Sequence, residues 1–172
     1  MKRVIIIHAW DSSPEQHWYR EEEAILQKLG FEVSVPVLPG GNWPKLDEWL
    51  SVIESLKPDK NTILIGHSLG VPAIFRYLDE SGQKVDKVIS VAGFVRDLGI
   101  EETRNFVDKL FDWGKIRSLI GKTVVIAQKE DPYISVEVAV EVADKTGGTW
   151  ILVDGNNHFD TMDLDLINAR LV

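Results

Sequence analysis

Short runs of apolar, mostly β-branched residues recur along the chain, and the segments between them carry apolar residues at helical spacing. Continuous runs of this kind are typical of parallel strands that are buried on both faces. The pattern predicts six strands, at Val4–Ile7, Phe31–Val37, Thr62–Ile65, Lys87–Ala92, Lys122–Ala127 and Trp150–Val153. Strands that alternate with helices form a parallel sheet covered by helices on both faces, and ligands bind at the carboxyl ends of its strands.

The segments between the strands predict the helices. Ser13 followed by Pro14 is typical of a helix start, and Gly30 is typical of a helix end. Further helices are predicted at Pro44–Leu56, from Leu69 to Leu78, around Glu101–Phe111, at Val136–Lys145 and at Asp163–Leu171. The longest segment without a strand is Gly93–Leu119, and it is the part of the chain available to flank a pocket.

The sequence G-H-S-L-G at residues 66–70 lies between a predicted buried strand and a predicted helix. A sharp strand-to-helix turn that raises a serine hydroxyl above the sheet needs small residues two before and two after that serine, because a larger side chain would collide with the neighbouring strand or helix. Pro72 is compatible with the first helical turn. Ser68 is therefore the candidate nucleophile, and the alternative is a glycine-rich turn without chemistry.

A serine hydroxyl is a weak nucleophile and needs an adjacent base. His158 follows the last predicted strand in the polar loop D-G-N-N-H-F and is the best candidate for that base. His8 ends the first strand and His67 lies within the turn, so we expect structural or loop-orienting roles for both. His17, beside Trp18, is interpreted as a packing or capping residue that can also face the pocket.

The base must be held in one tautomer by a third group. Asp131, in the loop Q-K-E-D-P-Y after the fifth strand, is preferred over Glu130 because a residue before proline is extended. Asp154 and Asp160 lie close to His158 in sequence, but we interpret them as solvated turn residues. Acidic residues near the last helix do not complete a metal-binding set, so no metal site is expected.

The order of nucleophile, acid and base along the chain is that of α/β-hydrolases. In such a site, the oxyanion hole would use the backbone amide of Leu69 and a second amide from the loop after the first strand, at Ala9 or Trp10. Side chains expected to bind substrate at the mouth of the pocket are His17, Phe94, Tyr133 and Phe159.

Composition narrows the classes of protein further. A chain of 172 residues with 44% hydrophobic residues is expected to form one domain, residues 1–172. Its net charge of −8 makes nucleic acid an unexpected partner. No apolar stretch is long enough for a membrane span, and the short apolar run after Lys2 and Arg3 has no cleavage site. The absence of cysteine is compatible with a reducing cytoplasm, where we expect the protein to lie.

Several stretches resemble one family of small serine hydrolases, those of the YdeN type, related to retinoblastoma-binding protein nine. The matching stretches are I-I-H, D-S-S, H-W, P-K-L-D-E-W-L, G-H-S-L-G-V-P-A-I-F-R-Y-L, V-A-G-F, Q-K-E-D and N-N-H-F. The resemblance runs nearly end to end and implies a minimal α/β-hydrolase fold, a six-stranded parallel sheet of order 2-1-3-4-5-6. It also implies a triad of Ser68, Asp131 and His158. Relatives usually have glycine where this chain has Ala9.

The function expected from these residues is hydrolysis of small carboxylic esters through an acyl-enzyme, with a small-molecule ester as substrate and no cofactor. Peptidase, amidase or other acyl-transfer activity on the same triad is an alternative. A second alternative is a protein-binding module on a hydrolase scaffold without catalysis, since fold does not determine function. The sequence itself does not indicate a protein partner.

Overall fold

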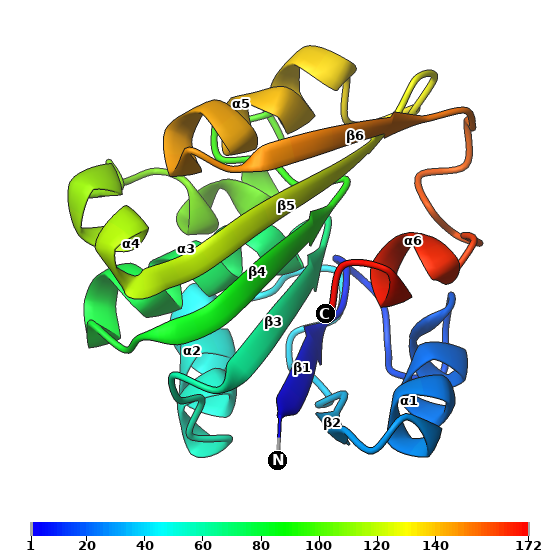
Figure 1. The fold of residues 1–172 in the computed structure, drawn as a ribbon. Helices are drawn as coiled ribbons and strands as arrows, with labels where there is room; N and C mark the ends of the chain where they lie inside the picture. Colours follow the sequence, from blue (N-terminus) through cyan, green and yellow to red (C-terminus); the bar gives the residue numbers. More distant parts are fainter. Residues whose placement is uncertain (1, 172) are drawn as a thin grey trace.

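The computed structural model describes residues 2–171, and a parallel sheet of six strands runs through it (Figure 1). The strands are β1 (Arg3–Ile7), β2 (Glu32–Ser34), β3 (Thr62–His67), β4 (Val85–Val91), β5 (Ile120–Gln128) and β6 (Thr149–Val153). Their order is β2-β1-β3-β4-β5-β6, and every neighbouring pair is parallel. The predicted strand order and the α/β-hydrolase class are confirmed.

Two layers of helices cover the sheet (Figure 1). Helices α2 (Leu46–Ser55), α3 (Gly70–Ser81), α4 (Trp113–Leu119) and α5 (Val136–Thr146) pack side by side on one face. Helices α1 (Tyr19–Lys28) and α6 (Asp165–Asn168) lie on the other face. The apolar side chains of β1 and β3 are fully buried between these layers, which explains why both strands read as continuous apolar runs.

The helix predicted from Ser13 onward is wrong in its first turn. Residues 14–18 form turns, and α1 begins at Tyr19. His17 adopts a φ of 53°, which lies in the left-handed region and is incompatible with a right-handed helix. The chain before α1 is therefore a loop at the carboxyl edge of the sheet.

The predicted second strand, Phe31–Val37, is shorter than expected. Only Glu32–Ser34 pairs with β1, at the edge of the sheet. Pro36 has no backbone N–H to donate to a ladder, so it cannot extend the pairing.

The segment between β4 and β5 also differs from the prediction. In place of one helix at Glu101–Phe111, it forms a 3₁₀ helix, η1 (Glu101–Phe106), and then the α-helix α4. Arg76 of α3 donates hydrogen bonds to the carbonyl oxygens of Phe106 (2.9 Å), Leu110 (3.3 Å) and Lys109, and its guanidinium lies 3.6 Å from the ring centroid of Phe111. A buried cation thus anchors this segment to α3.

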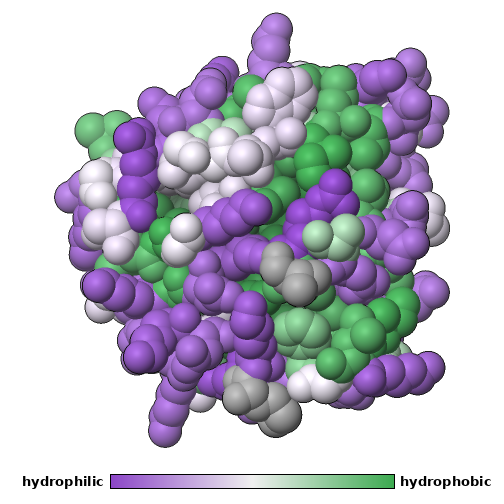
Figure 2. Space-filling model, in the orientation of Figure 1, coloured by the Kyte–Doolittle hydropathy of each residue, from purple (hydrophilic) through white to green (hydrophobic). Residues whose placement is uncertain are grey.

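Hydrophilic side chains surround smaller apolar areas on the face shown in Figure 2. Large apolar residues with exposed side chains include Leu29, Trp43, Leu110, Trp150 and Leu152. Scattered residues of this kind are normal on protein surfaces. Among residues 2–171, no helix has both the length and the apolar composition of a membrane span.

Glu22 of α1 is a buried carboxyl group whose oxygens have no hydrogen-bond partner among residues 2–171. Burial, reinforced by the charges of Glu21 and Asp165, raises the pKa of Glu22 to about 7. Since the folded-state pKa lies above the unfolded value, the stability linked to protonated Glu22 is complete below about pH 4.5 and is lost as pH rises through 7. The expected loss is about 3 kcal/mol.

Urea unfolding at pH 5 and pH 8.5 tests this prediction. Between pH 5 and pH 8.5, the free energy of unfolding of the wild-type protein should fall by most of this amount. That of Glu22→Gln should not show this fall, because the glutamine side chain does not ionise. Glu137→Gln, at an exposed position of α5 on the opposite face of the sheet, serves as the matched control and should keep the pH dependence. Equal pH dependence in wild type and Glu22→Gln would show that another group is responsible.

Candidate active site

Ser68 lies in a sharp turn between β3 and α3. Its φ is 51°, a left-handed conformation that costs about 1–3 kcal/mol in a residue other than glycine. The turn is held by hydrogen bonds from the amide of Ser68 to the carbonyl of Val91 (2.9 Å) and from the amide of Val71 to the carbonyl of Ser68 (3.0 Å). This is the geometry expected of a strained nucleophile turn.

The two glycines of the turn are required by close backbone approach. A Cβ at Gly70 would lie 2.2 Å from the carbonyl oxygen of Ile7 in β1, and a Cβ at Gly66 would lie 2.9 Å from the backbone of Gly70. Both distances are too short for a non-bonded contact of a carbon atom. A side chain at either position would therefore collide with the backbone, as the sequence predicted. The turn is thus packed against both β1 and α3.

His158 and Asp131 are brought together from loops 27 residues apart in sequence. Nδ1 of His158 lies 2.9 Å from each carboxylate oxygen of Asp131. Because a carboxylate only accepts hydrogen bonds, Nδ1 carries the proton and Nε2 is left free to accept one. The other two aspartates considered have different partners: Asp154 pairs with Lys129 at 2.5 Å, and Asp160 pairs with His17 at 3.2 Å.

The carboxylate of Asp131 is buried but well supplied with donors. Its Oδ1 accepts hydrogen bonds from the amides of Tyr133 and Ile134, both at 2.9 Å. Burial alone would raise the pKa of Asp131, but the hydrogen bonds from His158 and the two amides outweigh it and hold this pKa below its ordinary value. Asp131 therefore carries a negative charge next to His158 at neutral pH.

The loop after β1 presents two candidate amides, and only one is free. The amide of Ala9 donates to the hydroxyl of Tyr19 (3.0 Å), whereas no acceptor within residues 2–171 binds the amide of Trp10 or Leu69. Nδ1 of His8 bonds to the carbonyl of Ala9 (2.8 Å), and since the peptide is planar and trans, the amide of Trp10 points away from His8. Ala9 has no positive φ, which is why alanine is accommodated.

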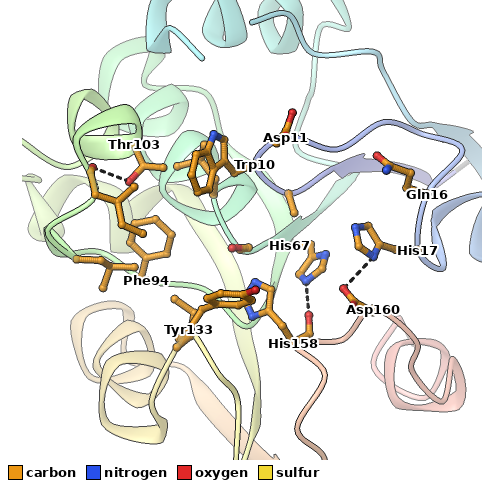
Figure 3. A pocket seen from close by; sticks show the side chains of 16 residues that line it. Trp10, Asp11, Gln16, His17, His67, Phe94, Thr103, Tyr133, His158 and Asp160 are labelled. Carbon is orange, nitrogen blue, oxygen red and sulfur yellow. Dashed lines mark hydrogen bonds and ion pairs between the residues drawn. The ribbon is translucent and has the colours of Figure 1, made fainter. Parts of the chain in front are cut away.

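A pocket of about 380 Å³ opens at the carboxyl ends of the strands, with Ser68, Leu69 and His158 in its wall. Figure 3 shows that Trp10, Phe94 and Thr103 form one side of it and that Gln16, His17 and Asp160 form the other. The remaining lining residues are Ala9, Asp11, His67, Leu98, Ile100, Tyr133 and Ile134. One side is thus largely apolar and the opposite side polar.

Three of the four predicted substrate-binding residues, His17, Phe94 and Tyr133, line this pocket. Phe159 does not: its side chain is 1% exposed and packs in the core, beside a separate hollow behind the β6 loop. Phe159 has a φ of 57° and lines that separate hollow, whereas His158 lines the pocket. Sequence reasoning missed Leu98, Ile100 and Ile134 because their apolar character does not distinguish a pocket wall from the core.

Within residues 2–171, Oγ of Ser68 and Nε2 of His158 are not hydrogen bonded, although both residues line the pocket. Such contacts often tighten only when substrate is bound. No group of three or more metal-ligating side chains is gathered in the described residues.

The family model for serine hydrolases matches residues 4–163 of the chain. The protein belongs to the serine hydrolase family. The match includes Ser68, Asp131 and His158 and ends before α6.

Two curated relatives of this serine hydrolase chain are similar over most of its length. The putative hydrolase YdeN of Bacillus subtilis (strain 168) is 28% identical over 163 residues, covering 92% of this chain and 86% of that protein. The serine hydrolase RBBP9 of Rattus norvegicus is 27% identical over 150 residues, covering 85% and 80%. The crystal structure of the ydeN gene product from B. subtilis superposes with a TM-score of 0.91 at 26% identity and covers 98% of each chain.

Proposed function

We propose that this serine hydrolase cleaves small carboxylic esters through an acyl-enzyme formed on Ser68. The observation that carries the proposal is the pairing of His158 Nδ1 with Asp131, which leaves Nε2 as a hydrogen-bond acceptor in the pocket that Ser68 also lines. An imidazole in this tautomer is the base that a serine nucleophile needs.

In the proposed reaction, His158 takes the proton of Ser68 as Oγ attacks the ester carbonyl carbon. The amides of Leu69 and Trp10 donate hydrogen bonds to the oxyanion that forms. His158 then gives its proton to the leaving alcohol as the carbon–oxygen bond breaks, and the acyl group remains on Ser68. A water molecule, deprotonated by His158, then attacks the acyl carbon. The bond from that carbon to Oγ of Ser68 breaks, His158 returns the proton to Oγ, and the carboxylic acid is released.

The two sides of the pocket suit the two parts of an ester, the acyl chain and the leaving group. Trp10, Phe94, Leu98 and Ile100 supply the apolar surface that an acyl chain would cover, and Gln16, His17 and Asp160 supply the polar surface suited to a leaving group. Each methylene that is buried contributes about 0.8 kcal/mol, or about fourfold in kcat/KM, until the chain leaves the pocket. A pocket of about 380 Å³ lies near the lower end of the range for small-molecule sites.

Hydrolysis of p-nitrophenyl esters of increasing acyl length tests the proposed function. We expect a higher kcat/KM for the acetate or butyrate than for the dodecanoate or palmitate, a burst of p-nitrophenol equal to the enzyme concentration, and no interfacial activation. Leu98→Ala should move the preferred length upward. Leu50→Ala, a half-buried leucine in a different hollow, is the matched control and should not.

Failure to hydrolyse any ester of the series would contradict the proposed function. Preference for the long chains would contradict the assignment of a shallow acyl side. Cleavage of the p-nitroanilide of butyric acid in preference to the ester would favour the amidase alternative.

A further inference from the structure

Three loops that meet at the pocket are joined below it by a chain of buried hydrogen bonds. The amide of Ala9, in the loop after β1, donates to the hydroxyl of Tyr19 at 3.0 Å. The same hydroxyl lies 2.7 Å from Nδ1 of His67, the residue before Ser68. Nε2 of His67 lies 2.8 Å from the carbonyl oxygen of His158, and Figure 3 shows this contact as a dashed line.

The direction of every bond in the chain follows from its partners. A carbonyl oxygen only accepts, so Nε2 of His67 carries the proton, and Nδ1 of the neutral ring must accept. The hydroxyl of Tyr19 therefore donates to His67 and accepts from Ala9. Burial and the nearby charge of His158 lower the pKa of His67 to about 3, and burial raises the pKa of Tyr19, so neither group changes its protonation at neutral pH.

This series of hydrogen bonds connects parts of the fold that the sheet itself does not place side by side. β3, which carries His67, is separated from β6 by β4 and β5, and His158 lies in the loop after β6. His158 and Phe159 both have positive φ, and the loop in this conformation places the His158 carbonyl within reach of His67. Strained residues keep such conformations only when their surroundings hold them.

We propose that Tyr19 and His67 are positioning residues, which hold the oxyanion loop, the Ser68 turn and the His158 loop at fixed mutual distances. Neither residue is hydrogen bonded to Oγ of Ser68 or to Nε2 of His158 within residues 2–171, and the ring centroids of His67 and His158 lie 5.2 Å apart. Tyr19 acts on the loop that presents the amide of Trp10 through its bond to Ala9, and His67 acts on the base through the main chain of His158. This inference rests on the proposed roles of Ser68 and His158.

The test is Tyr19→Phe, which removes one oxygen atom and two hydrogen bonds. Tyr77→Phe is the matched control, because Tyr77 is also buried but lies in α3 beside Glu54 and Ser81, away from the pocket. With p-nitrophenyl butyrate, kcat/KM per titrated active site should fall by about 10- to 100-fold in Tyr19→Phe, up to the lower end of the loss caused by a misplaced or missing oxyanion donor. In Tyr77→Phe it should stay within about twofold of wild type.

Two inhibitors separate positioning from general destabilisation. A trifluoromethyl ketone bound to Ser68 as a hemiketal places an oxyanion in the hole, so its Ki should rise in Tyr19→Phe by the same factor as kcat/KM falls. The Ki of butyrate, a ground-state ligand, should change by less than about twofold, since it does not require the oxyanion geometry. A purely structural role would lower the fraction of active protein and leave the per-site kcat/KM unchanged, and that result would overturn the proposal.

Nitrogen-15 spectra of the histidine rings provide a readout that does not depend on activity. The ring proton of His67 should reside on Nε2 in wild type, and the Nδ1 resonance should shift in Tyr19→Phe when its donor is lost. A His67 proton on Nδ1 would overturn the proposed direction of the chain. An inactive wild-type protein with the expected His67 spectrum would instead contradict the proposed function and leave the geometry of the chain intact.

Discussion

Ser68→Ala is expected to lower kcat for p-nitrophenyl butyrate by a factor on the order of 10⁶, the effect of removing a nucleophile from a serine triad. The left-handed backbone of Ser68 raises its hydroxyl into the pocket beside His158. Alanine keeps the turn but offers no oxygen for the acyl group. The assay compares this variant with Ser118→Ala, in which an exposed serine of α4 is changed, and that control should retain full activity.

A fluorophosphonate probe connects the loss of activity to the nucleophile itself. Peptide mapping after labelling should find the adduct on Ser68 and on no other residue, because Ser68 shares its pocket with the imidazole of His158, which activates a serine hydroxyl. Wild-type protein that is folded and unlabelled would contradict the assignment. Turnover by the Ser68→Ala variant would also contradict the assignment.

Asp131→Asn is expected to lower kcat by about 10⁴ while the protein remains folded. The amide oxygen of asparagine can still accept from Tyr133 and Ile134, so the local turn is preserved. Its NH₂ group, however, donates toward Nδ1 of His158 and leaves the ring proton on Nε2. In that tautomer, Nε2 cannot accept the proton of Ser68.

Steady-state kinetics with the same ester measure this effect, and circular dichroism checks the fold. Asp160→Asn is the control, because Asp160 also lies in the pocket wall but pairs with His17. It should retain activity within about tenfold of wild type, as expected for a residue outside the reacting groups. If Glu130→Gln abolished turnover and Asp131→Asn did not, the acid would be misassigned.

The strands could be predicted because burial on both faces demands continuous apolar runs, and Val4–Ile7 and Thr62–Ile65 are runs of this kind that are short and rich in β-branched residues. The Ser68 turn could be predicted because its glycines meet backbone atoms, so their spacing is dictated by geometry. The choice of Asp131 rested on the proline that follows it, and the structure places this carboxylate beside His158.

Other features depend on distances that a single sequence does not contain. The left-handed conformation of His17 shortened α1, although the Ser13–Pro14 pair is a normal helix start. Phe159 follows His158 directly, yet its turn directs it into the core. Tyr19 and His67 are 48 residues apart, and only the packing of α1 on the sheet shows that they are hydrogen bonded.

Arg76 anchors residues 106–111, so the pocket wall formed by the preceding residues and the sheet that carries the Ser68 turn are held by different contacts. Three donors of one side chain secure the segment that follows the pocket residues Leu98, Ile100 and Thr103, while β4 and β5 pair directly with each other beneath it. Residues 95–111 are thus attached to the helical layer at Arg76 of α3 and also at the start of α2, where Asn105 accepts a hydrogen bond from the amide of Leu46 (2.7 Å). Exchange of residues 95–111 among related chains, with Arg76 retained, offers laboratory evolution a route to new acyl preferences that leaves the Ser68 turn and the sheet untouched.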